Sequence, residues 1–270
     1  MKYVFLIKFC KMNINFSKLL LLFLLVLLVF SCKKDDKEPQ ADLTLANKQA
    51  LGTSAEGLLQ NTLFKKLNLE IVYPEGFRPE PETINNLIVF LEQRIHKSQG
   101  ITVVENVIPT PTGAPFTIEE IRAIEDDKRT IYNDGENLAV YIFFSNGNSS
   151  NDTPTKVTLG TAYRNTSIVI YKKTILDVAI SNGLNISLVE NTTLQHEFGH
   201  LFSLVNLQLD DIHQIHEDSQ HSKHCFVEEC LMYFETTANR SALAKMFQGK
   251  SSIRQFDPLC LADLAAKGGK

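Results

Sequence analysis

Apolar and polar positions follow two different periods along the chain between residues 61 and 171. Five short runs of apolar and β-branched residues, bounded by turn residues, are typical of buried strands: 69–73, 101–108, 138–144, 157–162 and 167–171. Two intervening stretches, 81–95 and 117–133, repeat apolar residues every three or four positions and predict amphipathic helices. This order predicts the α+β class, with a twisted mixed sheet and helices packed on it.

A further helix is predicted from about residue 188. Ser187 and Glu190 have the spacing of a capping box at its start. Apolar residues then recur at positions 194, 198, 201 and 205. The helix is therefore expected to pack an apolar stripe on the body of the protein and to leave its opposite face open to a cleft.

This helix carries the sequence His-Glu-x-x-His at residues 196–200. Four residues is close to one helical turn, so His196 and His200 leave the same face and can hold one zinc ion together. Glu197 lies beside them and can accept a proton from a metal-activated water. Two histidines and a glutamate also meet by chance on solvated helices, so the interpretation depends on the residues that follow.

The first 32 residues have the composition of an export signal. They contain no acidic residue, and an unbroken apolar run from 19 to 30 is followed by Ser31-Cys32. The run has the length of a signal-peptide core and is short for a membrane span. Its ending resembles the lipobox of bacterial lipoproteins, in which the cysteine, here Cys32, is lipidated; the alternative is an uncleaved N-terminal anchor. Residues 33–60 are expected to form a polar tether.

The chain after the leader is acidic. It contains 23 basic and 31 acidic residues, a formal net charge of −8, which disfavours nucleic acid and anionic lipid as partners. About 210 residues follow the tether, enough for one sizeable core or for two subdomains that share a cleft. We expect two subdomains, residues 61–206 and 207–270, divided just after the motif helix.

The residues after the motif helix resemble a known family. His224-Cys225 is followed by Cys230 and Met232, and this H-C-x(4)-C-x-M pattern resembles the signature of the archaemetzincins. The mature chain looks most similar to lipid-anchored membrane metalloproteases of Bacteroidetes, a related group. The resemblance implies a metzincin-like zinc peptidase fold, with a small irregular C-terminal subdomain. It also implies that His224 is the third zinc ligand and that Met232 forms the turn beneath the metal.

The sequence departs from the metzincin pattern between the motif and His224. Ser203 and Asn206 stand where that pattern has a glycine and the third histidine. Asn206 is a poor zinc ligand but tolerates the left-handed conformation that ends a helix. An insertion, residues 207–223, then delays the third ligand. The alternatives to His224 are His216, the strongest of them, and then His213, His221 and the carboxylate of Glu228.

Three cysteines remain after the leader: Cys225, Cys230 and Cys260. The region around Cys260 resembles a later Cys-x-x-Cys region of the archaemetzincins, with Asp257 in place of its first cysteine. The resemblance therefore implies that the three cysteines and Asp257 could hold a second, structural zinc. An oxidising exterior instead favours a disulfide between two of the cysteines.

Together these features predict a zinc-dependent endopeptidase anchored to the bacterial outer membrane, on its periplasmic or cell-surface face. Glu197 would act as the general base, and the edge strand at 157–162 would bind a peptide or protein substrate as an extra strand. The alternative is a lipoprotein that binds zinc or a partner without catalysis, which the five histidines between 200 and 224 favour. Glu197 favours hydrolysis, because metal binding alone has no use for it.

Overall fold

The computed structural model describes residues 42, 44–233 and 239–270. Residues Leu43–Lys270 form one compact unit. The leader expected at 1–32, including Cys32, lies outside the described residues. The stretch expected as a tether overlaps the compact unit, with a 3-10 helix η2 (Leu45–Asn47) and a helix α2 (Ala55–Leu59) that buries apolar side chains in the core. Among the described residues, no helix is long and apolar enough to cross a membrane.

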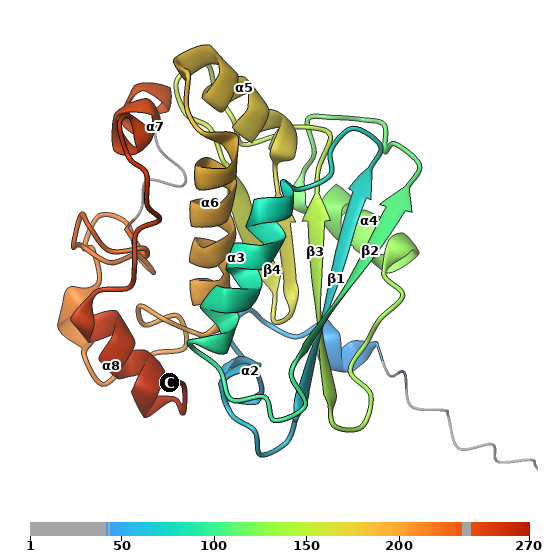
Figure 1. Ribbon diagram of the computed structural model, residues 1–270, viewed down its shortest axis with the longest axis vertical. Coiled ribbons are helices and arrows are strands. Elements are labelled where there is room, and N and C mark those ends of the chain that lie inside the picture. The colour runs from blue at the N-terminus through green and yellow to red at the C-terminus, as the bar shows by residue number, and fades with distance from the viewer. Residues whose placement is uncertain (1–41, 43, 234–238) are drawn as a thin grey trace, which may run out of the picture. The chain divides into compact units, whose positions relative to one another are not determined.

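The described chain folds around a five-stranded sheet. Its strands are β1 (Lys66–Pro74), β2 (Ile101–Ile108), β3 (Asn137–Phe144), β4 (Gly160–Arg164) and β5 (Ser167–Ile170). They lie in the order β2-β1-β3-β5-β4 (Figure 1). All neighbouring pairs are parallel except β5 and β4, which places an antiparallel strand at one edge. The predicted α+β class with a mixed sheet is confirmed.

The sequence pattern located most strands closely and one strand poorly. Three predicted runs coincide with observed strands or lie inside them: 101–108 in β2, 69–73 in β1 and 138–144 in β3. The run expected at 157–162 overlaps β4 only from Gly160 onward. Val157 and Leu159 are buried without belonging to a strand. Their hydrophobicity therefore reflects a loop that packs into the core, and the edge strand begins later in the chain than expected.

Helices cover both faces of the sheet (Figure 1). The helices α3 (Pro81–Glu92) and α6 (Ile186–Leu201) pack on one face, and α4 (Ile118–Lys128) covers the other. The capping box expected at the start of α4 is present, since Thr117 Oγ1 accepts a hydrogen bond from the Glu120 N–H at 3.2 Å. The pattern did not predict α5 (Lys172–Asn182), which connects β5 to α6.

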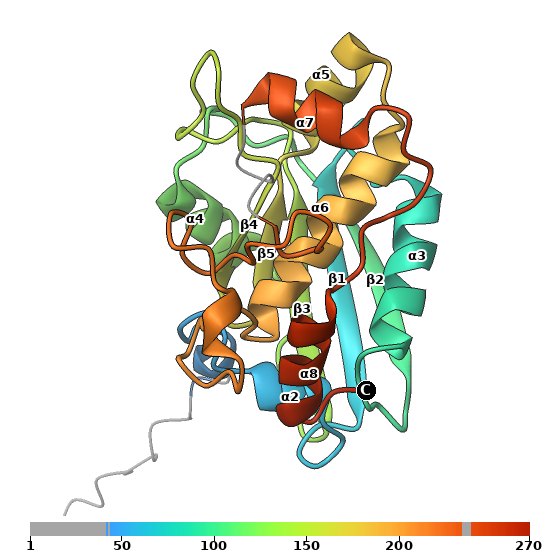
Figure 2. The same cartoon turned by 90° about the vertical axis from the view of Figure 1, so that its left-hand side faces the viewer.

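The motif helix α6 is buried on all sides. Every residue from Ser187 to Leu201 is buried, so the expected amphipathic helix with one open face is wrong. Figure 2 shows the reason: the C-terminal helices α7 (Arg240–Phe247) and α8 (Pro258–Ala266), with the loops between them, lie over the side of α6 that faces away from the sheet. His196, Glu197 and His200 therefore lie between two layers of protein.

The start of α6 also differs from the prediction. Its N-cap is Asn185, whose side chain accepts a hydrogen bond from the Leu188 N–H at 3.1 Å, so the expected capping box is not formed. Glu190 instead anchors the helix: its buried carboxylate accepts the Glu80 N–H at 2.8 Å and pairs with the buried ammonium of Lys172. Because an unpaired buried charge is costly, this ion pair ties α6 to α5 and to the start of α3.

The chain after α6 is irregular. Positive φ angles occur at Ser203, Val205, Asn206, Leu209 and Lys223. Asn206 adopts the expected left-handed conformation, with a φ of 56°, but α6 has already ended at Leu201. A short 3-10 helix, η3 (Gln214–His216), lies inside the insertion. Side chains of this region, including Met232 and Phe256, join the same apolar core as the sheet and α6.

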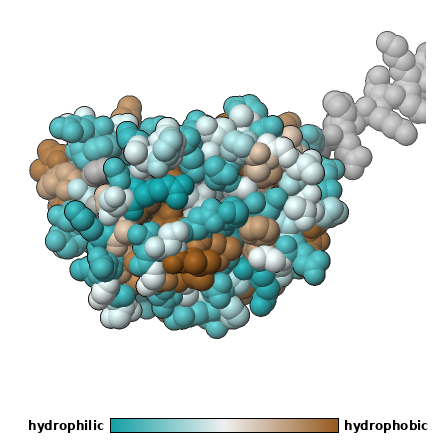
Figure 3. All heavy atoms as spheres, turned by 90° about the horizontal axis from the view of Figure 1, so that it is seen from above, coloured by the Kyte–Doolittle hydropathy of each residue, from teal (hydrophilic) through white to brown (hydrophobic). Residues whose placement is uncertain are grey.

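The face seen from above Figure 1 is predominantly hydrophilic. Figure 3 views the unit from above Figure 1, on the side where α5 and α7 lie, and shows apolar residues in separate patches among polar ones. Large apolar side chains are nevertheless exposed in and beside the insertion, namely Leu209, Ile212, Ile215 and Phe226. The insertion therefore packs mainly through its polar and charged residues.

Candidate active site

Three histidines meet at the inner side of α6. The ligand atoms of His196, His200 and His224 all lie within 4.8 Å of one another. The ring centroids are 4.9 Å apart for His196 and His200, 5.3 Å for His196 and His224, and 5.2 Å for His200 and His224. The helix supplies the first two rings at a four-residue spacing, and the loop after the insertion brings the third. We call these residues the histidine cluster.

The surroundings keep the histidine cluster neutral. Burial lowers the pKa of His196 to about 3, with the nearby His224 adding to the shift. Burial also lowers the pKa values of His200 and His224. The Leu231 carbonyl lies 2.7 Å from His196 Nδ1, which leaves Nε2 for a metal. His200 Nδ1 is buried with no hydrogen-bond partner among the described residues. Three neutral imidazoles that converge in this way fit a zinc ion.

Glu197 connects the histidine cluster to the edge of the sheet. Its Oε2 accepts the N–H of Ala162 on β4 at 2.7 Å. Burial raises the pKa of Glu197 to about 8, although the Ala162 N–H opposes the shift. The close approach depends on Gly160, because a Cβ there would lie 2.8 Å from Thr193 Cγ2 and 3.0 Å from Glu197 Cγ. A carboxyl group that titrates near neutrality suits a general base.

Met232 packs against the motif helix. It is fully buried, and a Cβ built on Gly199 would clash with its Sδ. The glycine of the motif therefore lets the methionine side chain pack directly against the backbone of α6.

The structure does not bring the other candidate third ligands to the histidine cluster. His213 Nδ1 lies 3.0 Å from Asp263 Oδ1, and His221 Nδ1 lies 2.8 Å from Asp218 Oδ2. Glu228 is exposed and lines a surface pocket of about 410 Å³ together with side chains of α7. His216, the main alternative, is fully buried in a different group of side chains.

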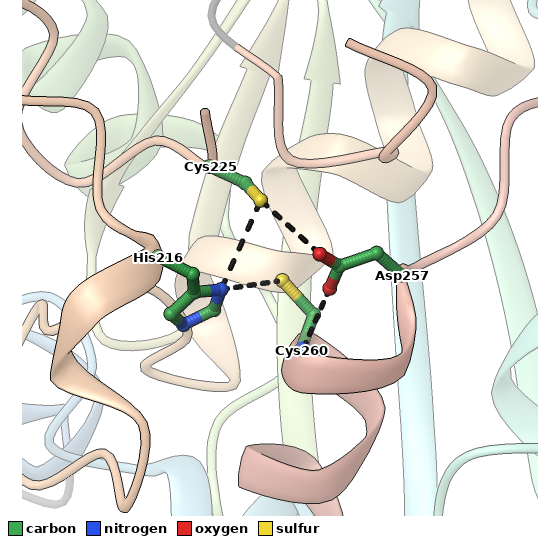
Figure 4. Close-up of side chains that lie close together, drawn as sticks. All are labelled: His216, Cys225, Asp257 and Cys260. Atoms are coloured by element: carbon green, nitrogen blue, oxygen red, sulfur yellow. Dashed lines mark hydrogen bonds between the residues drawn. The ribbon is translucent and has the colours of Figure 1, made fainter. Parts of the chain in front are cut away.

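This second group, the cysteine cluster, contains His216, Cys225, Asp257 and Cys260 (Figure 4). His216 Nδ1 lies 3.8 Å from Cys225 Sγ and 3.7 Å from Cys260 Sγ. Asp257 Oδ2 lies 3.5 Å from Cys225 Sγ, and Asp257 Oδ1 accepts the Cys260 N–H at 2.7 Å as the N-cap of α8. The four side chains come from the insertion, the loop after it and the start of α8.

The three cysteines are free thiols, so the disulfide expected from an oxidising exterior is not formed. Cys230 lies beside the cluster, with its Sγ 3.7 Å from Cys260 Sγ. Hydrogen bonds from the other two thiols lower the pKa of Cys230, and the N–H groups of Asp257 and Met232 act in the same direction. The same contacts raise the pKa values of Cys225 and Cys260, so the three thiols together favour one thiolate, the form of cysteine that binds metals.

Two functional contacts were missed from the sequence. Asp263, which faces His216, follows Cys260 at a spacing of three on α8, and this spacing could have indicated that both residues lie on one face. The Leu231 carbonyl that orients His196 belongs to the backbone, so no residue type could have marked it.

Two solved structures are similar to this chain. Archaemetzincin from Methanopyrus kandleri has 16% sequence identity and a TM-score of 0.46, and the match covers 75% of this chain and 96% of that chain. A zinc-dependent peptidase from Methanocorpusculum labreanum has 12% identity and a TM-score of 0.44, with 73% and 99% covered. No family model matches the sequence, and no curated protein matches it. At these identities and TM-scores, a conclusion about function must rest on the residues of the site.

Proposed function

We propose that this chain is a zinc-dependent peptidase, with zinc held by His196, His200 and His224. The observation that carries the proposal is the triangle of three neutral imidazoles, two buried and one half-buried, with the carboxyl group of Glu197 beside it. When bound there, zinc supplies a Lewis acid that activates water and polarises the scissile carbonyl. Three protein ligands leave a fourth position open, as catalytic zinc sites require.

The residues around the histidine cluster have separate roles in the proposed reaction. Glu197 accepts the proton of the attacking water and then donates it to the leaving amine. The Leu231 carbonyl holds His196 in one tautomer and orientation. Met232 supports the helix that carries the first two ligands.

The edge strand β4 is the proposed binding surface for the peptide. It pairs with β5 on one side and is last in the order of the described sheet. A peptide added to its outer edge would lie next to Glu197, because Ala162 of the same strand donates its N–H to that carboxylate. Backbone pairing of this kind accommodates many side chains, so endopeptidase activity on extended peptides is expected.

The location that we propose is the outer membrane, through a lipid on Cys32, as in the lipid-anchored metalloproteases of Bacteroidetes that the chain resembles. The support is the sequence of the leader: an apolar run of signal-peptide length that ends in Ser31-Cys32. Replacing Cys32 by Ser should release the protein from the membrane fraction, since each buried methylene of an acyl chain contributes about 0.8 kcal/mol.

A surface lipoprotein that binds zinc without catalysis is the competing proposal. It explains the many histidines between His200 and His224. It does not explain why Glu197 is buried beside the histidine cluster with its carboxylate held by the edge strand. Burying a carboxyl group without a charged partner is costly, and a storage site gains nothing from it.

The decisive experiment replaces Glu197 by Gln in the full-length chain. Gln has the shape of Glu and can still accept the Ala162 N–H, so zinc should remain bound at the wild-type stoichiometry. Hydrolysis of an unstructured protein such as casein should fall at least about 100-fold, because the general base is lost. Glu228→Gln is the matched control, since Glu228 is exposed and outside the histidine cluster; it should retain activity.

Two results would contradict the proposed peptidase function. One is a Glu197→Gln variant that cleaves casein as fast as the wild type. The other is a wild-type protein that binds zinc stoichiometrically but cleaves no peptide, which would favour the non-catalytic lipoprotein.

A further inference from the structure

The insertion that precedes His224 rests on helix α8. Figures 1 and 2 both show the orange loop of residues 207–223 beside this helix. Three large apolar side chains of the insertion are exposed, whereas its Asp211 and His216 are buried. The insertion therefore packs on α8 through polar and charged groups.

Asp263 of α8 is the centre of these contacts. Its side chain is fully buried. Its Oδ1 accepts the backbone N–H of His213 at 3.0 Å and lies 3.0 Å from Nδ1 of the same residue, while its Oδ2 lies 3.0 Å from His216 Nε2. One carboxylate therefore holds two residues of the insertion and uses both of its oxygens to do so.

Lys267, one helical turn after Asp263, holds the start of the insertion. Its Nζ lies 2.5 Å from Asp210 Oδ1 and 2.9 Å from Asp211 Oδ1. The other oxygen of Asp211 accepts the N–H of Asn206 at 2.8 Å. Because an unpaired buried charge is costly, these ion pairs restrict the positions in which the insertion can lie on α8.

Backbone hydrogen bonds connect His216 to His224. The Phe226 N–H donates to the His216 carbonyl at 3.0 Å, and the Asp218 N–H donates to the His224 carbonyl at 2.7 Å. The two stretches of chain also form an antiparallel bridge. They therefore lie side by side, and a shift of His216 would move His224 with it.

We propose that Asp263 is a positioning residue for the zinc site: through His216, it holds His224 where its ring can join the two histidines of α6. This inference rests on the proposed function, because it takes His224 as the third ligand. His224 is only half-buried, and its Nδ1 lies 3.0 Å from the carbonyl of Ser222 inside the same loop. Its position therefore depends on what holds the loop.

Zinc titration of the metal-free, full-length chain tests the proposal. Asp263→Asn keeps the size of the side chain but removes its charge, so His213 and His216 are held less firmly. Zinc affinity at the histidine cluster should fall about 10-fold, the lower end of the effect of losing an outer partner of a metal site. The component of the titration that belongs to the histidine cluster is the one that His200→Ala abolishes.

Two further variants accompany Asp263→Asn. Asp218→Asn is the matched control: Asp218 also contacts a histidine, with its Oδ2 2.8 Å from His221 Nδ1, but this pair lies within the insertion and is partly exposed. It should keep the wild-type zinc affinity. His213→Ala serves if Asp263→Asn does not fold, because the His213 side chain is 35% exposed; it should lower zinc affinity by a smaller factor.

A double-mutant cycle separates positioning of His224 from a general structural role. If Asp263 acts through His224, its replacement matters only while His224 is present. In a His224→Ala background, Asp263→Asn should therefore cause no further loss of zinc affinity. An equal loss in both backgrounds would overturn the proposal, because Asp263 would then act on the zinc site without His224.

The outcome does not depend on hydrolysis. If zinc affinity falls in Asp263→Asn as expected but the wild type cleaves no casein, the peptidase function fails and the positioning role stands. If the wild type cleaves casein and the folded Asp263→Asn variant keeps wild-type zinc affinity, the positioning role fails and the function stands. A His224→Ala variant that binds zinc like the wild type would also exclude the positioning role, since His224 would not be a ligand.

Discussion

The histidine cluster and the cysteine cluster meet at the neighbouring residues His224 and Cys225 but are built differently. Two of the three members of the histidine cluster come from one rigid helix, α6, which is buried between the sheet and the C-terminal segment. The members of the cysteine cluster come from the insertion, the following loop and the start of α8. A helix fixes the spacing of its side chains through its own backbone hydrogen bonds, whereas the side chains of three separate segments are held together by contacts between those segments.

This difference implies that the two regions owe their stability to different interactions. Packing, hydrogen bonds and one buried ion pair stabilise the region that carries His196 and His200. The region that carries His224 has few regular elements and several residues with positive φ. Variants that act on one region and spare the other can break or sharpen this comparison.

The largest effect is expected from the ion pair that anchors α6. Lys172→Met leaves Glu190 buried without its partner and should reduce the free energy of unfolding by about 3 to 5 kcal/mol. Lys173→Met is the matched control, because Lys173 pairs with Asp177 at the surface and such pairs contribute less than about 1 kcal/mol. Urea denaturation measures both. Equal losses in the two variants would show that the buried pair does not anchor the helix.

A smaller effect is expected from the loop-borne ligand. His224→Ala should reduce zinc affinity at the histidine cluster by about 100-fold or more, since even loss of an outer-shell partner costs 10- to 100-fold. The free energy of unfolding of the metal-free chain should change little, because His224 is only half-buried. Chelator competition checks the first statement and urea denaturation the second. If zinc stays bound in this variant, the third ligand is a different residue.

The contact between the two regions can be tested at Gly199. Gly199→Ala should destabilise the protein by about 1 to 3 kcal/mol through overpacking against Met232, although alanine favours helix by about 1 kcal/mol. Met232→Ala in the same chain should recover part of that loss by making room for the new Cβ. Thermal unfolding compares the single and double variants. Simple addition of the two losses would argue against direct contact.

The smallest effect concerns Glu197 in the metal-free protein. Its folded pKa, about 8, lies above the ordinary value of 4.5. The folded chain therefore keeps a proton that the unfolded chain releases, and stability falls as pH rises from 4.5 to 8. Glu197→Gln removes this loss, so its stability relative to wild type should increase by about 1 kcal/mol between pH 5 and pH 6. Parallel pH profiles of the two proteins would contradict the buried position of Glu197.

The elements that the sequence predicts well are those with clear local signals along them or at their ends. β2 is rich in β-branched residues and is followed by proline, and α4 starts with a capping box. In both elements the local sequence therefore favours the secondary structure that the fold contains. The amphipathic pattern of α6 predicts one open face, but the C-terminal segment covers that face. The apolar stripe marks only the face toward the sheet, and its polar residues are buried as well.

The candidate site also contains residues that the sequence predicts well and residues that it does not. One helical turn is enough to predict that His196 and His200 point together. Which later histidine joins them depends on the path of the insertion, and no periodicity describes that path. His216 was an alternative third ligand because of its position in the chain; the hydrogen bond from Phe226 to its carbonyl and the contact with Asp263 direct it to the cysteine cluster instead.

The contact of Met232 with Gly199 has an evolutionary consequence. The two positions cannot drift independently, because any side chain at 199 occupies the space that the thioether fills. Among natural relatives, a residue larger than glycine at 199 should therefore appear together with a smaller residue at 232. A relative that keeps Gly199 and Met232 retains the close packing of the helix on this turn, even where the sequences of the surrounding loops differ.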